Sequence, residues 1–268
     1  MEGDDEKAMA MLNEAMEKSN DDPGVQHLIY QERAHVYQMV GNFDKAKEDL
    51  ERAAAIAPND ESREEVYLSI LSMATGSEEP DVVVKLADKY EKLIEDPERK
   101  HRLLGMKAQN LLRGGETEKA IALYNNLIQQ LKDDPRQMTQ YRIDIINALA
   151  NDGKNEEAFK MFKDLVDGDL TGEMIPNNLN MLNGNFTDIE GSKEVFVEFY
   201  TKAIEALEKA GALDNNYFTA MVNLAKTYEE MGKKDFAFAL YEKVIEKSQD
   251  EFPRLQALEN MFQYYLVK

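Results

Sequence analysis

The stretch from His27 to Asp60, HLIYQERAHVYQMVGNFDKAKEDLERAAAIAPND, contains two amphipathic segments joined by a short turn. Apolar and small residues recur every three or four positions on both sides of Gly41, which is the spacing of one face of an α-helix. Ala34 and Ala46 lack bulk, so we expect them where the two helices cross. Gly41 can adopt the left-handed conformation that ends a helix, and Pro58 stops the second segment. The stretch therefore predicts a helix-turn-helix unit.

This pattern resembles the tetratricopeptide repeat, a helix-turn-helix unit of about 34 residues with large, small and aromatic side chains at set positions. The positions that carry the resemblance are Tyr30, Ala34, Tyr37, Gly41, Phe43, Ala46, Leu50, Ala53 and Pro58. Arg33 departs from the pattern, because it stands where the family usually has leucine. Its charged end either reaches the surface or weakens that contact.

The same spacing returns along the chain and predicts further units. The predicted units are 27–60, 62–98, 101–134, 139–167, a degenerate unit at 168–211, and 218–250. In the second unit, Ser62 and Glu65 form the pattern of a capping box, and a longer loop is expected from Thr75 to Pro80. In the degenerate unit, the Asn-rich segment 175–185 favours turns, so its first helix is expected to be short or distorted.

Both ends of the chain fit half-repeats. Residues 1–22 fit the turn and second helix of a unit, and residues 252–268 fit a first helix that caps the array. The prediction is an all-α fold, a right-handed α-solenoid of about six helix-turn-helix repeats with a half-repeat at each end. We expect one superhelical domain over residues 1–268.

Composition limits the possible functions. Lys and Arg number 32 against 52 Asp and Glu, a net charge of −20, which argues against a nucleic-acid partner because such partners need a basic face. The absence of cysteine excludes a thiolate zinc site and a cysteine nucleophile. No apolar run is long enough to cross a membrane, and the acidic start does not resemble a signal peptide. A cytoplasmic protein is the default expectation, and a mature exported fragment is the alternative.

The residues that usually carry catalysis or bind metals are scarce. His27 and His35 stand two helical turns apart, too far to share a metal ion, so we expect a solvent-facing or groove-lining role for them. Asp167, Asp169 and Glu173 resemble the start of a calcium loop, but Asn178 occupies the place of the bidentate glutamate. A turn is the preferred interpretation. We therefore expect no enzyme activity, no cofactor and no metal.

The resemblance implies that the first helices of the units line a concave groove that holds a peptide or a partner's helix. The outward positions of those helices, the candidate partner-binding residues, are Leu28, Gln31, His35, Gln38, Arg102, Gln109, Arg113, Gln140, Ile143, Asn147 and Asn151. Amide side chains can bind a peptide backbone, while Arg102 and Arg113 could receive a carboxylate. The basic clamp by which some family members bind acidic chaperone tails is reduced here to Arg102, so that role is disfavoured.

Three functions follow from these patterns. The leading one is a non-enzymatic scaffold or adaptor that binds a protein or peptide in the concave groove. The acidic surface would steer a partner with a basic surface, and the chain itself is expected to be a monomer or to self-associate weakly. The first alternative is a self-assembling structural module that completes repeats between chains. The second alternative is a protein that binds calcium or another ligand at the irregular segment 168–190.

Overall fold

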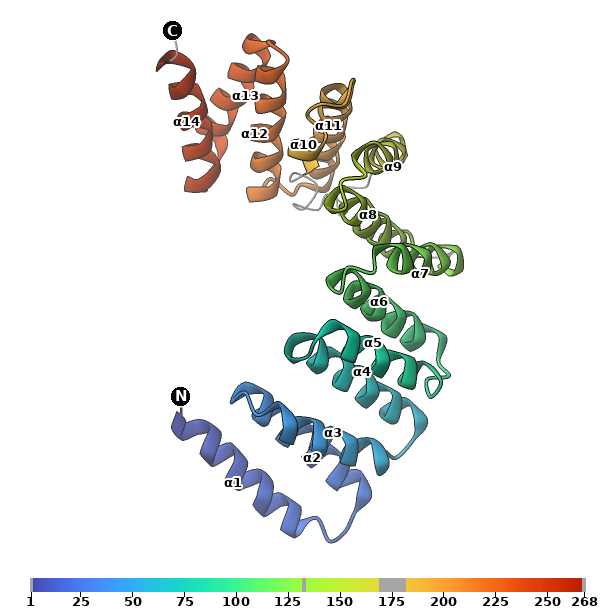
Figure 1. Ribbon diagram of the computed structural model, residues 1–268. Coiled ribbons are helices and arrows are strands. Elements are labelled where there is room, and N and C mark those ends of the chain that lie inside the picture. The colour runs from blue at the N-terminus through green and yellow to red at the C-terminus, as the bar shows by residue number, and fades with distance from the viewer. Residues whose placement is uncertain (1, 132–133, 169–181, 267–268) are drawn as a thin grey trace. The chain divides into compact units, whose positions relative to one another are not determined.

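The computed structural model describes residues 2–131, 134–168 and 182–266, which form helices and no strand (Figure 1). The chain divides into two compact units, Met1–Gln130 and Leu131–Lys268. Each unit is a succession of helical hairpins and is described by itself. The expectation of one superhelical domain over both units stays a prediction. Among the described residues, no helix is long and apolar enough to cross a membrane.

The first unit consists of helices α1 to α7. Their bounds are α1 (Glu2–Lys18), α2 (Pro23–Met39), α3 (Phe43–Ala55), α4 (Asp60–Ser77), α5 (Pro80–Glu91), α6 (Pro97–Arg113) and α7 (Thr117–Gln130). Each helix packs against the next, and α4 also packs against α6. We call α2, α4 and α6 the first helices of their repeats, and α3, α5 and α7 the second helices.

The second unit consists of helices α8 to α14. Their bounds are α8 (Pro135–Asn151), α9 (Asn155–Asp167), α10 (Leu182–Asn185), α11 (Ser192–Ala210), α12 (Asn215–Glu230), α13 (Lys234–Lys247) and α14 (Glu251–Leu266). Here α8, α12 and α14 are first helices, and α9, α11 and α13 are second helices. The ring of Phe162 on α9 packs between Phe186, which follows α10, and Phe196 and Phe199 of α11.

The same type of backbone turn joins the two helices in each of four hairpins. At its centre a glycine has a φ near +75°, a conformation that costs other residues steric energy. The next residue donates its N–H to a carbonyl five positions back, as Asn42 does to Tyr37 and Lys233 does to Tyr228, both at 2.8 Å. The turn glycines are Gly41, Gly115, Gly153 and Gly232. The left-handed conformation predicted for Gly41 is confirmed.

Two expectations about the second repeat are wrong. The N-cap of α4 is Asn59, whose side-chain oxygen accepts the N–H of Ser62 at 2.8 Å, so Ser62 lies inside the helix. Asparagine is as good a cap as serine and stands three residues earlier. The longer loop is also absent, because α4 continues to Ser77 and only two residues precede Pro80. One glycine, Gly76, costs a helix only about 1 kcal/mol, which the burial of Ala74 against the core can offset.

Small side chains mark the crossing of the two helices of a repeat, as predicted. Ala34 on α2 and Ala46 on α3 are both 0% exposed and belong to one core with Leu50 and Val66. Ala237 on α13 is 0% exposed in the corresponding core of the second unit. Any larger side chain there would meet the neighbouring helix.

Arg33 follows neither of the two alternatives set out for it, because an acidic partner lies inside the same repeat. Its Nε donates to Oδ2 of Asp49 at 2.7 Å, and its Nη2 donates to Oδ1 at 2.6 Å. The side chains are 15% and 3% exposed, respectively. The hydrogen bond to Asp49 raises the pKa of Arg33, so the guanidinium stays protonated at neutral pH. A bidentate ion pair thus occupies the place of the family's leucine.

The degenerate repeat is described only in part. Its second helix, α11, is capped by Gly211, the last residue of the predicted unit, and this glycine has a left-handed conformation. Most of the calcium-like loop, including Asp169, Glu173 and Asn178, lies outside the described residues. Asp167 is the last residue of α9 and is exposed. A short or distorted first helix was expected in this repeat. Within the described residues of that segment, the structure shows the short helix α10.

Candidate functional site

The predicted partner-binding residues of the first repeat lie along α2. Leu28 is 61% exposed, and His35 is also exposed, while Gln31 and Gln38 are half-buried. Met39, one residue after Gln38, is 66% exposed and was not among the predicted residues. The exposed face of α2 therefore offers more apolar surface than the sequence pattern indicated.

The two arginines predicted to bind a ligand carboxylate already have partners on α4, the neighbouring first helix. Nη1 of Arg102 donates to Oε1 of Glu65 at 3.0 Å. Nη1 of Arg113 donates to the backbone oxygen of Thr75 at 2.6 Å and to Oδ1 of Asn110 at 2.8 Å. Both arginines thus tie α6 to α4, and their binding of a ligand carboxylate stays a prediction. Gln109, between them on α6, is exposed.

A third arginine on α6 extends this connection between repeats. Arg99 donates to Oε1 of Glu65 and to Oε1 of Glu61, at 2.9 Å each. Glu64 is buried beside it and accepts the backbone N–H of Glu95 at 2.8 Å. These residues were missed, although a signal exists in the sequence. Opposite charges recur about one repeat length apart, and the helix stack brings such positions together.

The remaining predicted residues lie on α8, in the second unit. Gln140 and Asn151 are exposed, and Asn147 is half-buried. Ile143 is 1% exposed, so its predicted outward position is wrong. An isoleucine on a first helix contributes more stability in the core than on a wetted wall, because burial removes its apolar surface from water. These predicted partner-binding residues thus lie in part on α6 of the first unit and in part on α8 of the second unit.

The histidines do not form a site together. Nδ1 of His27 lies 2.9 Å from the backbone oxygen of Ala53, and its side chain is 4% exposed, so the expected solvent-facing role is wrong. Nε2 of His101 lies 2.9 Å from Oε1 of Gln130. Within the described ranges, no group of three His, Asp or Glu side chains could hold a metal ion.

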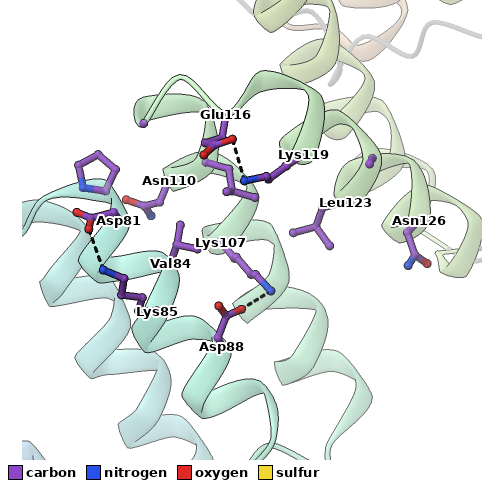
Figure 2. A pocket seen from close by; sticks show the side chains of 14 residues that line it. Asp81, Val84, Lys85, Asp88, Lys107, Asn110, Glu116, Lys119, Leu123 and Asn126 are labelled. Carbon is purple, nitrogen blue, oxygen red and sulfur yellow. Dashed lines mark hydrogen bonds and ion pairs between the residues drawn. The ribbon is translucent and has the colours of Figure 1, made fainter.

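The structure shows a cavity that the sequence reasoning did not predict. It has a volume of about 670 Å³ and lies between α5 and α7, with α6 as its floor (Figure 2). We call it the α5–α7 trough. Its lining residues are Pro80, Asp81, Val84, Lys85 and Asp88 of α5, Lys107, Asn110 and Leu111 of α6, Gly114 and Glu116 of the turn, and Lys119, Ala122, Leu123 and Asn126 of α7.

Three ion pairs surround the trough. Lys85 contacts Asp81 at 3.1 Å, and its hydrogen bond lowers the pKa of Asp81. Lys119 contacts Glu116 at 3.0 Å, and Lys107 contacts Asp88 at 2.6 Å (Figure 2).

Lys107 is held more firmly than the other lysines of the trough. Burial lowers its pKa, but the hydrogen bonds to Asp88 and Glu91 raise the pKa by more, so the net shift is upward. Lys107 is therefore a fixed cation at the floor of the trough.

Two further cavities have the same placement in their repeats. One, of about 290 Å³, lies between α3 and α5 over α4, and Phe43 and Val82 stand at its edge. Another, of about 600 Å³, lies between α11 and α13 over α12. In the latter, the hydroxyl of Tyr217 donates to Oε1 of Glu208 at 2.5 Å, with Lys243 at 3.5 Å from the same oxygen. All three cavities open between successive second helices, not along the first helices.

The glycine turns, the buried alanine pairs and the stacked hairpins define an all-α helical repeat protein of helix-turn-helix units. A tetratricopeptide repeat model matches residues 2–167, and a second tetratricopeptide repeat model matches residues 200–261. The chain therefore belongs to the tetratricopeptide repeat family, as its sequence pattern predicted.

Solved structures agree with this fold. The C-terminal part of a tetratricopeptide repeat-containing protein from Cytophaga hutchinsonii is 15% identical, with a TM-score of 0.56 and coverage of 94% of each chain. A signal transduction ATPase with numerous domains and a tetratricopeptide repeat sensor, from Pyrococcus horikoshii, is 16% identical with a TM-score of 0.54. That match covers 98% of this chain and 40% of the other. No curated protein matches the sequence.

The family narrows the function in general terms. Tetratricopeptide repeat proteins are generally interaction modules and not enzymes, so the fold supports a protein–protein interaction scaffold.

Proposed function

We propose that this chain is a scaffold or adaptor that holds a peptide segment of a partner protein against its first helices. The observation that supports this proposal is the composition of the exposed face of α2, α4 and α6 in the first unit. Leu28 and Met39 are largely exposed, and the small Ser69 and Ser72 of α4 and the amide of Gln109 are exposed as well. Amides and hydroxyls can bind a peptide backbone of any sequence, and exposed apolar side chains can pack against its residues.

The charges of this face favour a neutral or basic segment. Arg102 and Arg113 are engaged by α4, so a ligand carboxylate would have to displace Glu65 or the carbonyl of Thr75. Such a displacement leaves a charged or polar group without its partner, which costs free energy. The net charge of −20 adds a long-range attraction for basic partners.

Replacing Gln109 with alanine is expected to weaken the binding of such a partner about fivefold, because one hydrogen bond contributes about 1 kcal/mol. Crosslinking with mass spectrometry in native lysate would identify a partner, and titration of the purified proteins would then measure its affinity. The control is Gln129→Ala, which removes an exposed glutamine from a second helix. Crosslinks confined to the second helices, or equal losses in both variants, would contradict the proposal.

A second candidate function is self-assembly, and the exposed face of α14 favours it. Phe252, Leu255, Leu258 and Phe262 are 47% to 62% exposed and fall on one stripe of the helix. Self-assembly would bring this stripe against α1 of a second copy, where Met11 is 70% exposed, and so complete a repeat in a contact that recurs from molecule to molecule.

Self-assembly predicts a molar mass, measured by light scattering, that rises across a hundredfold range of protein concentration. Leu255→Glu should restore the monomer mass, because a charge would then be buried in the contact. The exposed position of Leu255 makes this variant harmless to the fold. A constant monomer mass in the unmodified chain would rule out self-assembly and leave the peptide-binding proposal intact.

A further inference from the structure

The first helices α4 and α6 pack against each other in the first unit, and acidic side chains gather where both helices begin (Figure 1). Glu61 and Glu65 stand one turn apart on α4, so they lie on the same side of that helix, and their side chains are 74% and 41% exposed. Glu98 lies in the first turn of α6, one turn before Arg102, and is exposed. We call Glu61, Glu65 and Glu98 the carboxylate end of the first-helix face.

Carboxylates outnumber cations at this end. Arg99 lies close to four of them, namely Glu61 at 2.9 Å, Glu65 at 2.9 Å, Glu64 at 3.5 Å and Asp96 at 3.6 Å. Arg102 is the second cation, and it shares Oε1 of Glu65 with Arg99. Lys100 is two residues from Glu98 and therefore lies on the opposite side of α6. Four carboxylates and two guanidinium groups leave two negative charges in excess, to which Glu98 adds a third.

One buried oxygen of this cluster lacks a hydrogen bond. Glu64 is 4% exposed, and its Oε1 accepts the backbone N–H of Glu95 at 2.8 Å. Its Oε2 lies 3.5 Å from Nη1 of Arg99 but accepts no hydrogen bond from any part of the chain that the structure describes. A buried acceptor without a hydrogen bond costs free energy. A cation supplied to Glu61 and Glu65 from outside would release Arg99 toward Glu64.

A purely structural role does not account for the excess of carboxylates. Charges that only join two repeats stabilise best when they are matched, because like charges repel each other. The buried pair of Arg33 and Asp49 inside the first repeat is matched in this way. Uncompensated charge on an exposed face is instead what an interface uses to select a partner of the opposite charge.

The far end of α6 has the opposite character. Arg113, in its last turn, donates to the backbone oxygen of Thr75 at 2.6 Å and to the amide oxygen of Asn110 at 2.8 Å. Both acceptors are neutral, so they do not cancel the charge of Arg113. A basic group on a ligand is therefore directed to the carboxylate end and away from Arg113.

We propose that the carboxylate end binds an arginine side chain of the partner segment, with its guanidinium group between Glu61, Glu65 and Glu98. This proposal rests on the peptide binding proposed above for the first helices, and it names the side chain that the peptide must carry. Arginine suits the site better than lysine, because its planar group offers five N–H donors that can reach two carboxylates at once.

The test compares two fluorescein-labelled peptides that differ in charge alone. Both are short segments of serine and leucine. One carries an arginine at its centre, and the other carries citrulline there, which has nearly the same shape but no charge. Binding to the full chain is measured by fluorescence anisotropy at physiological salt concentration. We expect the arginine peptide to bind about tenfold more tightly than the citrulline peptide.

A double variant locates the arginine. Glu61→Gln with Glu98→Gln keeps the size of both side chains and should weaken the arginine peptide about tenfold, without changing the affinity for the citrulline peptide. The matched control is Glu48→Gln with Glu157→Gln. Glu48 pairs with an arginine on α3, and Glu157 lies in the first turn of α9. This control makes the same change in net charge on second helices and should leave both affinities unchanged. Circular dichroism should show equal melting for all variants.

Three results would overturn the arginine site: no binding of the arginine peptide, equal affinity for the two peptides, or equal losses in the two double variants. Gln109→Ala separates this failure from a failure of the first-helix proposal. If both peptides bind equally and Gln109→Ala weakens both, a peptide still binds along the first helices but without the arginine site. If both bind and neither Gln109→Ala nor the Glu61 and Glu98 variant weakens them, both proposals are wrong.

Discussion

Replacing Arg33 with leucine is expected to lower the free energy of unfolding by about 2–4 kcal/mol, although leucine is the residue that the family usually has at this position. The reason is Asp49, which is 2% exposed and would lose its bidentate partner inside the core. Removal of one member of a buried pair typically costs about 3–5 kcal/mol. Arg52 lies 3.7 Å from the same carboxylate and should offset part of that cost.

Urea denaturation followed by circular dichroism measures this effect. The double variant Arg33→Leu, Asp49→Leu should recover most of the loss, because no buried charge then lacks a partner. Arg52→Leu is the control, since that side chain is 48% exposed and a surface ion pair contributes about 1 kcal/mol or less. Equal stability of Arg33→Leu and the unmodified chain would mean that Asp49 is not held in the core as described.

The sequence predicts the repeats well because the determinants of a repeat are local. A left-handed glycine, two small residues at the crossing and a three-to-four-residue apolar spacing lie within about 34 residues of one another. Gly41, Ala34 and Ala46 have the conformation and burial that their positions predicted. Helix ends are predicted less well, because Asn59 and Ser62 compete for the same cap and only tertiary context decides between them.

The candidate site was harder to predict because it depends on contacts between repeats. Arg102 and Arg113 look like free cations when one helix is considered alone. Their partners, Glu65 and Thr75, stand 37 and 38 residues earlier, about one repeat away. The pair Arg102–Glu65 shows that opposite charges at this separation are a usable signal, whereas Arg113 binds a backbone oxygen that no residue type indicates. The cavities between second helices carry no comparable signal, because their size depends on how far apart two helices lie after packing.

Replacing Ala46 with leucine is expected to lower the free energy of unfolding by about 1–3 kcal/mol. Ala46 is 0% exposed, and the added atoms would force α3 away from the core that it shares with Ala34 and Val66. Ala237→Leu should have an effect of the same size in the second unit, because it stands at the equivalent place on α13. If both losses are observed, the repeat register holds from one end of the chain to the other.

Each substitution has a matched control on the same helix. Ala55→Leu on α3 and Ala239→Leu on α13 add the same side chain at exposed positions, so both should change the free energy of unfolding by less than about 0.5 kcal/mol. Urea denaturation of the four variants measures the difference between buried and exposed positions directly. A loss at Ala55 equal to that at Ala46 would show that leucine disfavours α3 for reasons other than packing. A neutral Ala46→Leu would place the crossing of α2 and α3 at other residues and would undo the assignment of the repeat.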